Sequence, residues 1–426
     1  MGELYNISGK SDRYYTMWIF ITALLLMPLF PAFPQDTAVA AAAAGTVRLS
    51  GEVRGPYSLV ERSDWSRYDN GKYIGHVYRE VRASIIPQNS PSKLSAGYRG
   101  KFFVMEETLR DMRQSARAVD AVVPVSFRFD GETGLIIDPE SDDRGFPSLR
   151  NFPAFPSGAI SPGSKWVAKG KRAVDPLNEG KPVVIPLIAE YEYRGVEDYR
   201  TIPVHRIFAK YASRYEGQGG DFQVQGTHNV DILIRVSDGI PLMMRDTLDE
   251  TYFWPKGSAQ GGASGSTIRF RGFTLTFGDG LVPLDRDAFI TAVSTKERTL
   301  PADSGIDLAA VPEGVKLTIS DIRFEPDSDE MLASERPRLD MLARILKEKA
   351  DRTFLVEGHT AAIGRSAGEM ALSVRRAKQM VDELTNRGIP AERFIYKGWG
   401  GTNPLGDNAN DAGRRRNRRV EITILE

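Results

Sequence analysis

The chain has 426 residues, with 56 basic and 56 acidic side chains, so its formal net charge is zero. This balance gives no global field that would draw the protein to nucleic acid or to an anionic surface. The sequence contains no cysteine, which excludes disulfides, thiolate metal sites, a cysteine nucleophile and a lipidated cysteine. At this length we expect two or three domains, each with its own core.

Residues 1–45 have the pattern of an export signal. Lys10 and Arg13 precede an apolar run over 17–30, and an alanine-rich stretch follows. A basic region, a short apolar core and small residues near a cleavage site are typical of a secretory signal peptide. Prolines end the run short of the ~20 apolar residues that a spanning helix needs. We therefore predict an exported protein, with an uncleaved membrane anchor as the alternative.

Two β-rich stretches are expected next, over 46–138 and 165–293. The first stretch has a mostly strand-like pattern. In the second, alternating apolar and polar residues with glycine-containing turns indicate an antiparallel meander that is either curved or closed. One helix is expected in the first stretch, from about Glu106 to Val119. The long strands expected in the second stretch cover 183–193, 199–215, 221–236 and 267–277.

Two segments interrupt these patterns. Residues 139–164 are rich in Pro, Gly, Ser and Asp. Proline removes a hydrogen-bond donor from a strand and fixes φ. We therefore interpret 139–164 as a linker or an extended strap, and 294–314 as a second linker.

From residue 315 to residue 426 the periodicity changes to β-α-β-α-β. A first helix is expected to begin near Ser334, and a second near Ser366 with its end at Gly388. The fold class expected for the chain is two antiparallel β-rich modules followed by an α/β sandwich. The apolar sides of the two helices are Leu339, Leu342, Ile345 and Leu346, and then Met370, Val374, Ala377, Val381 and Leu384.

Three separated motifs occur in this last part of the chain. They are Gly358-His359-Thr360, then Leu372-Ser373 with Arg376-Ala377, and finally Asn417-Arg418-Arg419-Val420-Glu421. Their order and spacing resemble the OmpA-like peptidoglycan-binding domain, the family of OmpA, Pal and MotB. The resemblance covers roughly the last quarter of the chain.

The resemblance implies a pocket for the diamino acid of the peptidoglycan stem peptide. Arginines at the positions of Arg376 and Arg418 would hold its carboxylate with their planar donor groups. The family usually has an acidic residue where this chain has Ala361, and that residue pairs with the ligand's ammonium group. Asp327 and Glu369 also depart from the family pattern and are the candidates to compensate. The implied site is therefore degenerate on its ammonium-binding side.

No enzyme, cofactor or metal site is expected. The four histidines show no paired ligand spacing, and no nucleophile elbow is present. His359 is interpreted as a structural hydrogen-bonding residue at a strand end. Asp246, Asp249 and Glu250 form an acidic cluster, which is most simply interpreted as solvated strand or turn residues.

These observations predict a non-enzymatic envelope protein of the periplasm, associated with the outer membrane or cell wall. Its partners would be the peptidoglycan stem peptide and outer-membrane or envelope proteins, and no nucleic acid. One alternative is an OmpA-like scaffold that has lost wall binding and serves protein or lipid interactions. Another is that the middle region forms an outer-membrane β-barrel. A third is that the β-rich region carries lipid or another apolar ligand.

Overall fold

A computed structural model describes residues 45–426 apart from short internal segments. The expected export signal lies outside the described residues. No helix in the described part of the chain is long and apolar enough to cross a membrane. The segments left out are 50–52, 54, 89–94, 109–115, 131–133, 142–143, 178, 218–221, 257–264, 281–283, 297–304, 326–327 and 350.

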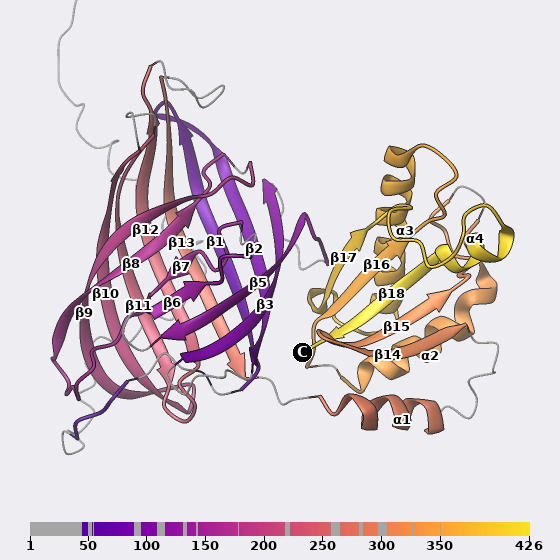
Figure 1. The fold of residues 1–426 in the computed structure, drawn as a ribbon, viewed down its shortest axis with the longest axis horizontal. Helices are drawn as coiled ribbons and strands as arrows, with labels where there is room; N and C mark the ends of the chain where they lie inside the picture. The colour runs from indigo at the N-terminus through magenta and orange to yellow at the C-terminus, as the bar shows by residue number, and fades with distance from the viewer. Residues whose placement is uncertain are drawn as a thin grey trace, which may run out of the picture. The chain divides into compact units, whose positions relative to one another are not determined.

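A nearly closed, barrel-like antiparallel sheet of twelve strands forms the first part of the described chain (Figure 1). Most neighbours in the sheet are also neighbours in sequence, in the order β6-β5-β3-β2-β1-β13-β12-β11-β10-β9-β8-β7. The strands are β1 (Tyr57–Asp69), β2 (Lys72–Gln88), β3 (Ser95–Thr108), β5 (Ala121–Asp130), β6 (Gly134–Ile137), β7 (Leu149–Arg150), β8 (Lys165–Val174), β9 (Val183–Tyr199), β10 (Ile202–Glu216), β11 (Gln223–Arg235), β12 (Pro241–Trp254) and β13 (Ser266–Gly280).

Both expected β-rich stretches contribute to this one sheet. Strand β1 pairs with β13 along its whole length, from Tyr57 opposite Gly280 to Asp69 opposite Ile268. The helix expected from Glu106 to Val119 is wrong in its described residues. Strand β3 continues through Thr108 because it pairs with β2, and β4 (Arg117–Ala118) is a short strand. Residues 109–115 lie outside the described residues.

The interior of the sheet is largely apolar. Alternation along each strand places every second side chain inward, as β9 shows with buried Ile185, Leu187, Ala189, Tyr191 and Tyr193. The segment 139–164 adds further aromatic side chains to this interior, since Phe146 is buried and stacks on Phe102 with ring centroids 5.4 Å apart. The segment is held there by β7, which pairs with β8.

A second sheet carries the C-terminal part of the chain. Its order is β14-β15-β18-β16-β17-β4, and β16 and β17 are parallel, as the β-α-β-α-β expectation requires. Strand β18 lies between β15 and β16 and is antiparallel to both. The elements are α1 (Arg286–Lys296), β14 (Ile306–Val311), β15 (Gly314–Ser320), α2 (Arg336–Lys347), β16 (Phe354–His359), α3 (Ser366–Asn386), β17 (Phe394–Gly398), α4 (Asp411–Asn417) and β18 (Arg419–Leu425).

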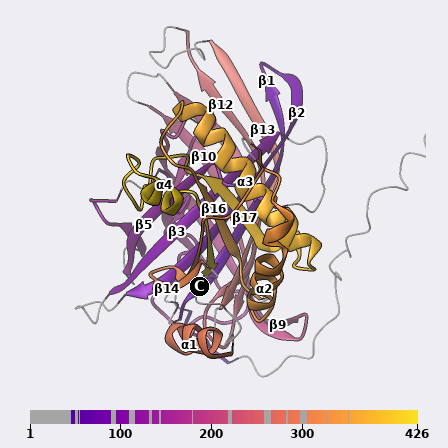
Figure 2. The same ribbon diagram turned by 90° about the vertical axis from the view of Figure 1, so that its right-hand side faces the viewer.

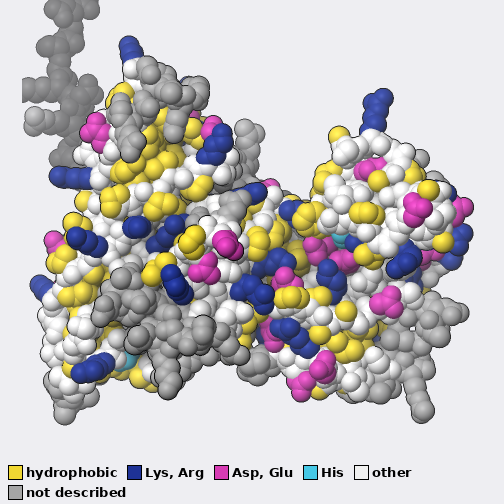
Figure 3. All heavy atoms as spheres, in the orientation of Figure 1, with side chains coloured by type: hydrophobic (Ala, Val, Ile, Leu, Met, Phe, Trp, Pro, Cys, Tyr) yellow, Lys and Arg dark blue, Asp and Glu magenta, His cyan; other side chains and the backbone are white. Residues whose placement is uncertain are grey.

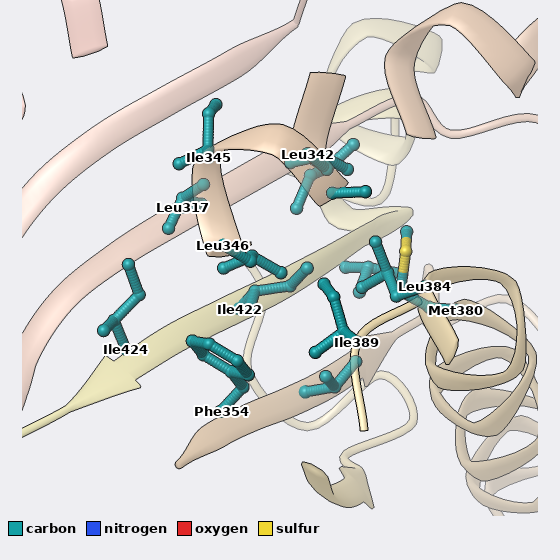
Figure 4. Packing of buried hydrophobic residues seen from close by; sticks show 14 of the residues in the cluster. Leu317, Leu342, Ile345, Leu346, Phe354, Met380, Leu384, Ile389, Ile422 and Ile424 are labelled. Carbon is teal, nitrogen blue, oxygen red and sulfur yellow. The ribbon is translucent and has the colours of Figure 1, made fainter. Parts of the chain in front are cut away.

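Helices α2 and α3 pack against this sheet through the apolar positions expected from sequence. Figure 2 shows α3 running beside β16 and β17. Met370 is the exception, because it lies in the first turns of α3 and is 38% exposed. The core between helices and sheet includes Leu342, Ile345 and Leu346 of α2, Met380 and Leu384 of α3, and Leu317, Phe354, Ile422 and Ile424 of the strands (Figure 4).

Gly358 lets α3 approach β16 closely. A Cβ atom at this position would lie 2.2 Å from the backbone oxygen of Ser373 on α3. Gly398 on β17 has the same constraint, since its Cβ would lie 2.4 Å from Ser373 Oγ. The glycine of the Gly-His-Thr motif and the serine of the Leu-Ser motif therefore meet at one helix–sheet contact.

We expect Gly358→Ala to lower the free energy of unfolding by about 1–3 kcal/mol, because a backbone atom cannot move aside as a flexible side chain would. Urea denaturation measures this change. Gly368→Ala is the matched control, since Gly368 lies in the same helix α3 and its Cβ would meet nothing within 4 Å. The control variant should be neutral or up to about 1 kcal/mol more stable. Equal effects from the two substitutions would contradict the close-approach argument.

Candidate functional site

Arg376 lies midway along helix α3, and its side chain contacts the segment that joins β15 to α2. Its guanidinium carbon is 4.4 Å from the ring centroid of Phe324, and its Nε donates a hydrogen bond to the Ser328 carbonyl at 3.3 Å. Neighbouring Ala377 is fully buried, so the helix register turns Arg376 toward the rim of the core. The arginine remains partly exposed. Its planar group is thus oriented by an aromatic face and a carbonyl while part of it stays accessible.

Arg418 reaches the same connecting segment from the other end of the domain sequence. It follows helix α4, and its carbonyl accepts a hydrogen bond from the Asp321 amide at 3.1 Å. Its guanidinium lies 4.0 Å from the Asp321 carboxylate, and 39% of its side chain is exposed. The structure therefore brings Arg376 and Arg418 to one segment, residues 321–331.

Ala361 and Glu369 are placed together at a different turn, which follows β16. Ala361 is buried, with 4% of its surface exposed. Glu369 Oε1 accepts hydrogen bonds from the amides of Ile363 at 2.8 Å and Gly364 at 2.6 Å. The Glu369 carboxylate thus closes the turn that carries Ala361. Asp327 lies outside the described residues.

Asn417 organises the loop that faces this turn, a role that the sequence reading missed. Its side-chain oxygen accepts from the amides of Leu405 and Gly406 at 2.7 and 2.8 Å, and its amide group donates to Asn408 Oδ1 at 2.8 Å. Asn408 Oδ1 in turn accepts from the Ala362 amide at 3.1 Å. The buried asparagine of the last motif therefore ties loop 403–410 to the turn at 361. The signal available in the sequence was a carboxamide directly after a run of arginines.

His359 lies at the end of strand β16, as expected, but its expected hydrogen bonding is wrong. Neither ring nitrogen has a hydrogen-bond partner among the described residues, and Nε2 lies 3.9 Å from the Glu421 carboxylate. Burial, followed by the charge of Arg419, lowers the pKa of His359 to about 4. The imidazole is therefore neutral at physiological pH.

The acidic cluster of strand β12 is buried inside the barrel-like sheet, contrary to the solvated interpretation. Glu250 is 1% exposed and forms an ion pair with Arg172 on β8. Asp246 is 6% exposed and lies 2.9 Å from Nδ1 of His228 on β11. Only Asp249 faces outward, where it pairs with Arg269 at 2.5 Å. Alternation along β12 was the signal for this, because positions 246, 248, 250, 252 and 254 share one face.

The charged groups in this buried cluster shift the pKa values of their neighbours. Burial alone would raise the pKa of Glu250, but the Arg172 charge and the contact with His228 hold it well below its usual range. Burial and Arg172 both oppose a charged His228, yet Asp246 and the hydrogen bonds to Asp246 and Glu250 raise its pKa. In this cluster the buried positive and negative charges therefore offset one another. Among the described residues, no group of three or more His, Asp or Glu side chains is arranged to hold a metal ion.

Comparison with known proteins identifies the class of the C-terminal domain. Residues 323–418 match the OmpA family. Outer membrane protein A of Bordetella avium is 33% identical over 147 residues, which are 33% of this chain and 74% of that protein. The chain belongs to the OmpA family.

Two further similarities cover smaller shares of the chain. The peptidoglycan-binding protein ArfA of Mycobacterium tuberculosis is 33% identical over 103 residues, which are 24% of this chain and 32% of that protein. The chain thus spans about a third of the length of that relative. A solved outer-membrane protein structure from Borrelia burgdorferi has 30% identity and a TM-score of 0.25, covering 29% of this chain and 100% of that one.

Proposed function

We propose that the C-terminal domain docks on peptidoglycan and links it to the outer membrane or to envelope partners, without catalysis. The observation that carries this proposal is the placement of Arg376 and Arg418 against one segment, with both guanidinium groups partly exposed. The related ArfA is named as a peptidoglycan-binding protein, which supports the same role here. The site of action would be the periplasmic side of the envelope.

The two arginines suit the carboxylate of a diamino acid in the stem peptide. Guanidinium groups bind carboxylates through paired N–H donors, and such charge-assisted bonds are stronger than neutral ones. Arg376 is already oriented by Phe324, so less side-chain freedom is lost when a ligand binds. This half of the proposed site is equipped for its ligand.

The ammonium half of the proposed site is altered. Ala361 offers a buried methyl group where an acidic partner would otherwise stand. Glu369 lies beside the same turn, and one of its oxygens is engaged by the Ile363 and Gly364 amides. We therefore propose that the domain prefers a stem peptide with a different diamine, such as ornithine, and that Glu369 or Asp327 meets its amine.

The outward face of the barrel-like sheet carries paired charges as well as exposed apolar side chains. Exposed charges pair across neighbouring strands, as Lys210 does with Glu190 at 3.0 Å. Figure 3 shows Lys, Arg, Asp and Glu side chains interspersed with hydrophobic ones on this face. Charged side chains facing lipid are destabilising. These ion pairs support a periplasmic β-rich region over the alternative of an outer-membrane β-barrel.

Co-sedimentation with purified sacculi tests the docking proposal. We expect the protein to pellet with sacculi, and Arg376→Ala and Arg418→Ala each to weaken binding at least tenfold. Arg375→Ala is the matched control, because Arg375 is the next residue on α3 and its side chain is 51% exposed. The control variant should bind as the parent does. Equal loss in all three variants would indicate general charge attraction and would contradict a specific site.

A further inference from the structure

The interior of the barrel-like sheet contains two adjoining cavities of different character. One has a volume of about 180 Å³ and is lined mainly by apolar side chains. The other has a volume of about 120 Å³ and is lined by charged and polar groups as well. Glu61, Ser148 and Thr276 line both, so the two cavities adjoin. Together the volumes reach the lower end of the range of about 300–1,000 Å³ typical of small-ligand pockets.

The larger cavity is lined by side chains that suit a hydrocarbon chain. Strands β2, β3 and β5 and the segment 139–164 contribute buried apolar or aromatic side chains to it. Such a cavity gives water few polar partners, so an alkyl chain is the better occupant. The buried side chains that line it include Val81, Ala83, Ile85, Tyr98, Phe102, Phe127 and Phe146.

Three side chains that line the smaller cavity each carry an N–H group that lacks an acceptor in the described part of the chain. Trp65 Nε1, Arg79 Nε and Arg172 Nε are buried, and none of these three N–H groups finds a hydrogen-bond partner within the described ranges of the chain. The hydroxyl of Thr276, which lines both cavities, is in the same situation. Buried donors without partners are rare and costly in folded proteins. Because these side chains line one cavity, they favour a ligand rich in acceptor atoms.

The acidic groups in the same wall are already engaged. Glu250 pairs with Arg172, and Asp246 is hydrogen-bonded by His228 and by Tyr211 at 3.2 Å. Asp175 accepts hydrogen bonds from two backbone amides of the following turn. Burial raises the pKa of Glu61, which favours its uncharged form. These carboxyl groups therefore leave the N–H donors available to an anionic group.

Arg79 stands where the two cavities meet. It lines the polar cavity, and its guanidinium carbon is 5.2 Å from the ring centroid of Phe146, which lines the apolar one. An acceptor group bound by Arg79 would therefore have the aromatic wall directly beside it. This juxtaposition fits a ligand with a charged head and an apolar tail.

We propose that the interior of the sheet binds a single-chain amphiphile with an anionic head group, either a carboxylate or a phosphate. The tail occupies the cavity lined by Phe102, Phe127 and Phe146. The head group accepts hydrogen bonds from Trp65, Arg79 and Arg172. This site is separate from the peptidoglycan proposal and does not depend on it.

Calorimetric titration of the delipidated protein with dodecanoate, dodecyl phosphate and dodecanol, each below its micelle concentration, tests the proposal. We expect one or both anionic amphiphiles to bind at least tenfold more tightly than dodecanol, because only they satisfy the buried donors. Which of the two binds more tightly distinguishes a fatty acid from a phosphate-bearing lipid. No binding, or equal binding of dodecanol, would overturn the proposal.

Two variants and a control locate the site. Arg79→Met should weaken binding of the anionic amphiphiles about tenfold to a hundredfold and leave dodecanol unchanged. Ala83→Phe fills the apolar cavity and should abolish binding of all three. Arg99→Met is the control, since Arg99 is exposed on β3, and it should bind as the parent does. Near-ultraviolet circular dichroism verifies that each variant is folded. Undiminished binding by folded Arg79→Met and Ala83→Phe variants would place the ligand elsewhere and overturn the assignment.

Discussion

Glu250→Gln is expected to lower the free energy of unfolding by about 3–5 kcal/mol, because it leaves the buried Arg172 guanidinium without a charged partner. Glu250 is 1% exposed, and the side chain of Arg172 is 12% exposed. The same carboxylate also lies 3.4 Å from Nε2 of His228. Removing the charge of Glu250 therefore leaves the buried Arg172 and His228 without the carboxylate that offsets their charges. Urea denaturation followed by tryptophan fluorescence measures the loss, since Trp254 lies in the same strand β12.

Glu190→Gln is the matched control for this prediction. It makes the same chemical change in the same sheet, but Glu190 pairs with Lys210 at the surface, where their side chains are 61% and 59% exposed. Exposed pairs of this kind contribute about 0–1 kcal/mol. A Glu250→Gln variant as stable as the Glu190→Gln variant would show that the buried pair is not needed for the stability of the sheet.

His359→Leu is expected to reduce the loss of stability between pH 6.5 and pH 4. The pKa of His359 is about 4 in the folded protein, against about 6.5 for an unfolded histidine. The folded state therefore binds its proton less readily, and stability falls as the pH drops through this window. The difference corresponds to about 3 kcal/mol, and below both pKa values no further loss arises from this residue.

The measurement for this prediction is the free energy of unfolding from pH 8 to pH 4 in parent and variant. The slope of the unfolding free energy against pH is the quantity to compare, because leucine also changes the packing, and that effect is the same at every pH. His76→Leu is the control, since the His76 side chain is 55% exposed on strand β2 and its removal should preserve the acid-dependent slope. A His359→Leu variant with the parent's slope would mean that His359 becomes charged within the folded core.

Sequence periodicity was sufficient to predict the secondary structure of the C-terminal domain, but not the whole barrel-like sheet. Leu339 and Leu342 recur at helical spacing and are buried, and Gly388 follows the end of α3 with a φ of 89°. In the β-rich region, by contrast, the pairing of β1 with β13 joins residues about two hundred positions apart. Local patterns carry no information on such pairing, so the two stretches were expected as separate modules.

The structure brings two of the predicted site residues to one segment, and their role in binding stays a prediction. Motif spacing predicts Arg376 and Arg418 as site residues, and the structure places both against the segment 321–331. The sequence predicts a solvated Glu250, because charged residues are seldom buried unless they are paired. Its partner Arg172 lies 78 positions away, beyond the reach of any local pattern.

We propose that the domain keeps the carboxylate-binding arginines while Ala361 alters its preference for the ligand's amine. The most direct test is co-sedimentation of the protein and its Ala361→Asp variant with sacculi that differ in their stem diamine. We predict that the parent pellets with at least one type of sacculus. The variant should shift toward sacculi containing diaminopimelate by roughly thirtyfold or more, as expected for restoring a buried charge partner. Failure of the parent to pellet with any sacculus, with pelleting restored only by Ala361→Asp, would contradict the claim and would mean a domain that has lost wall binding.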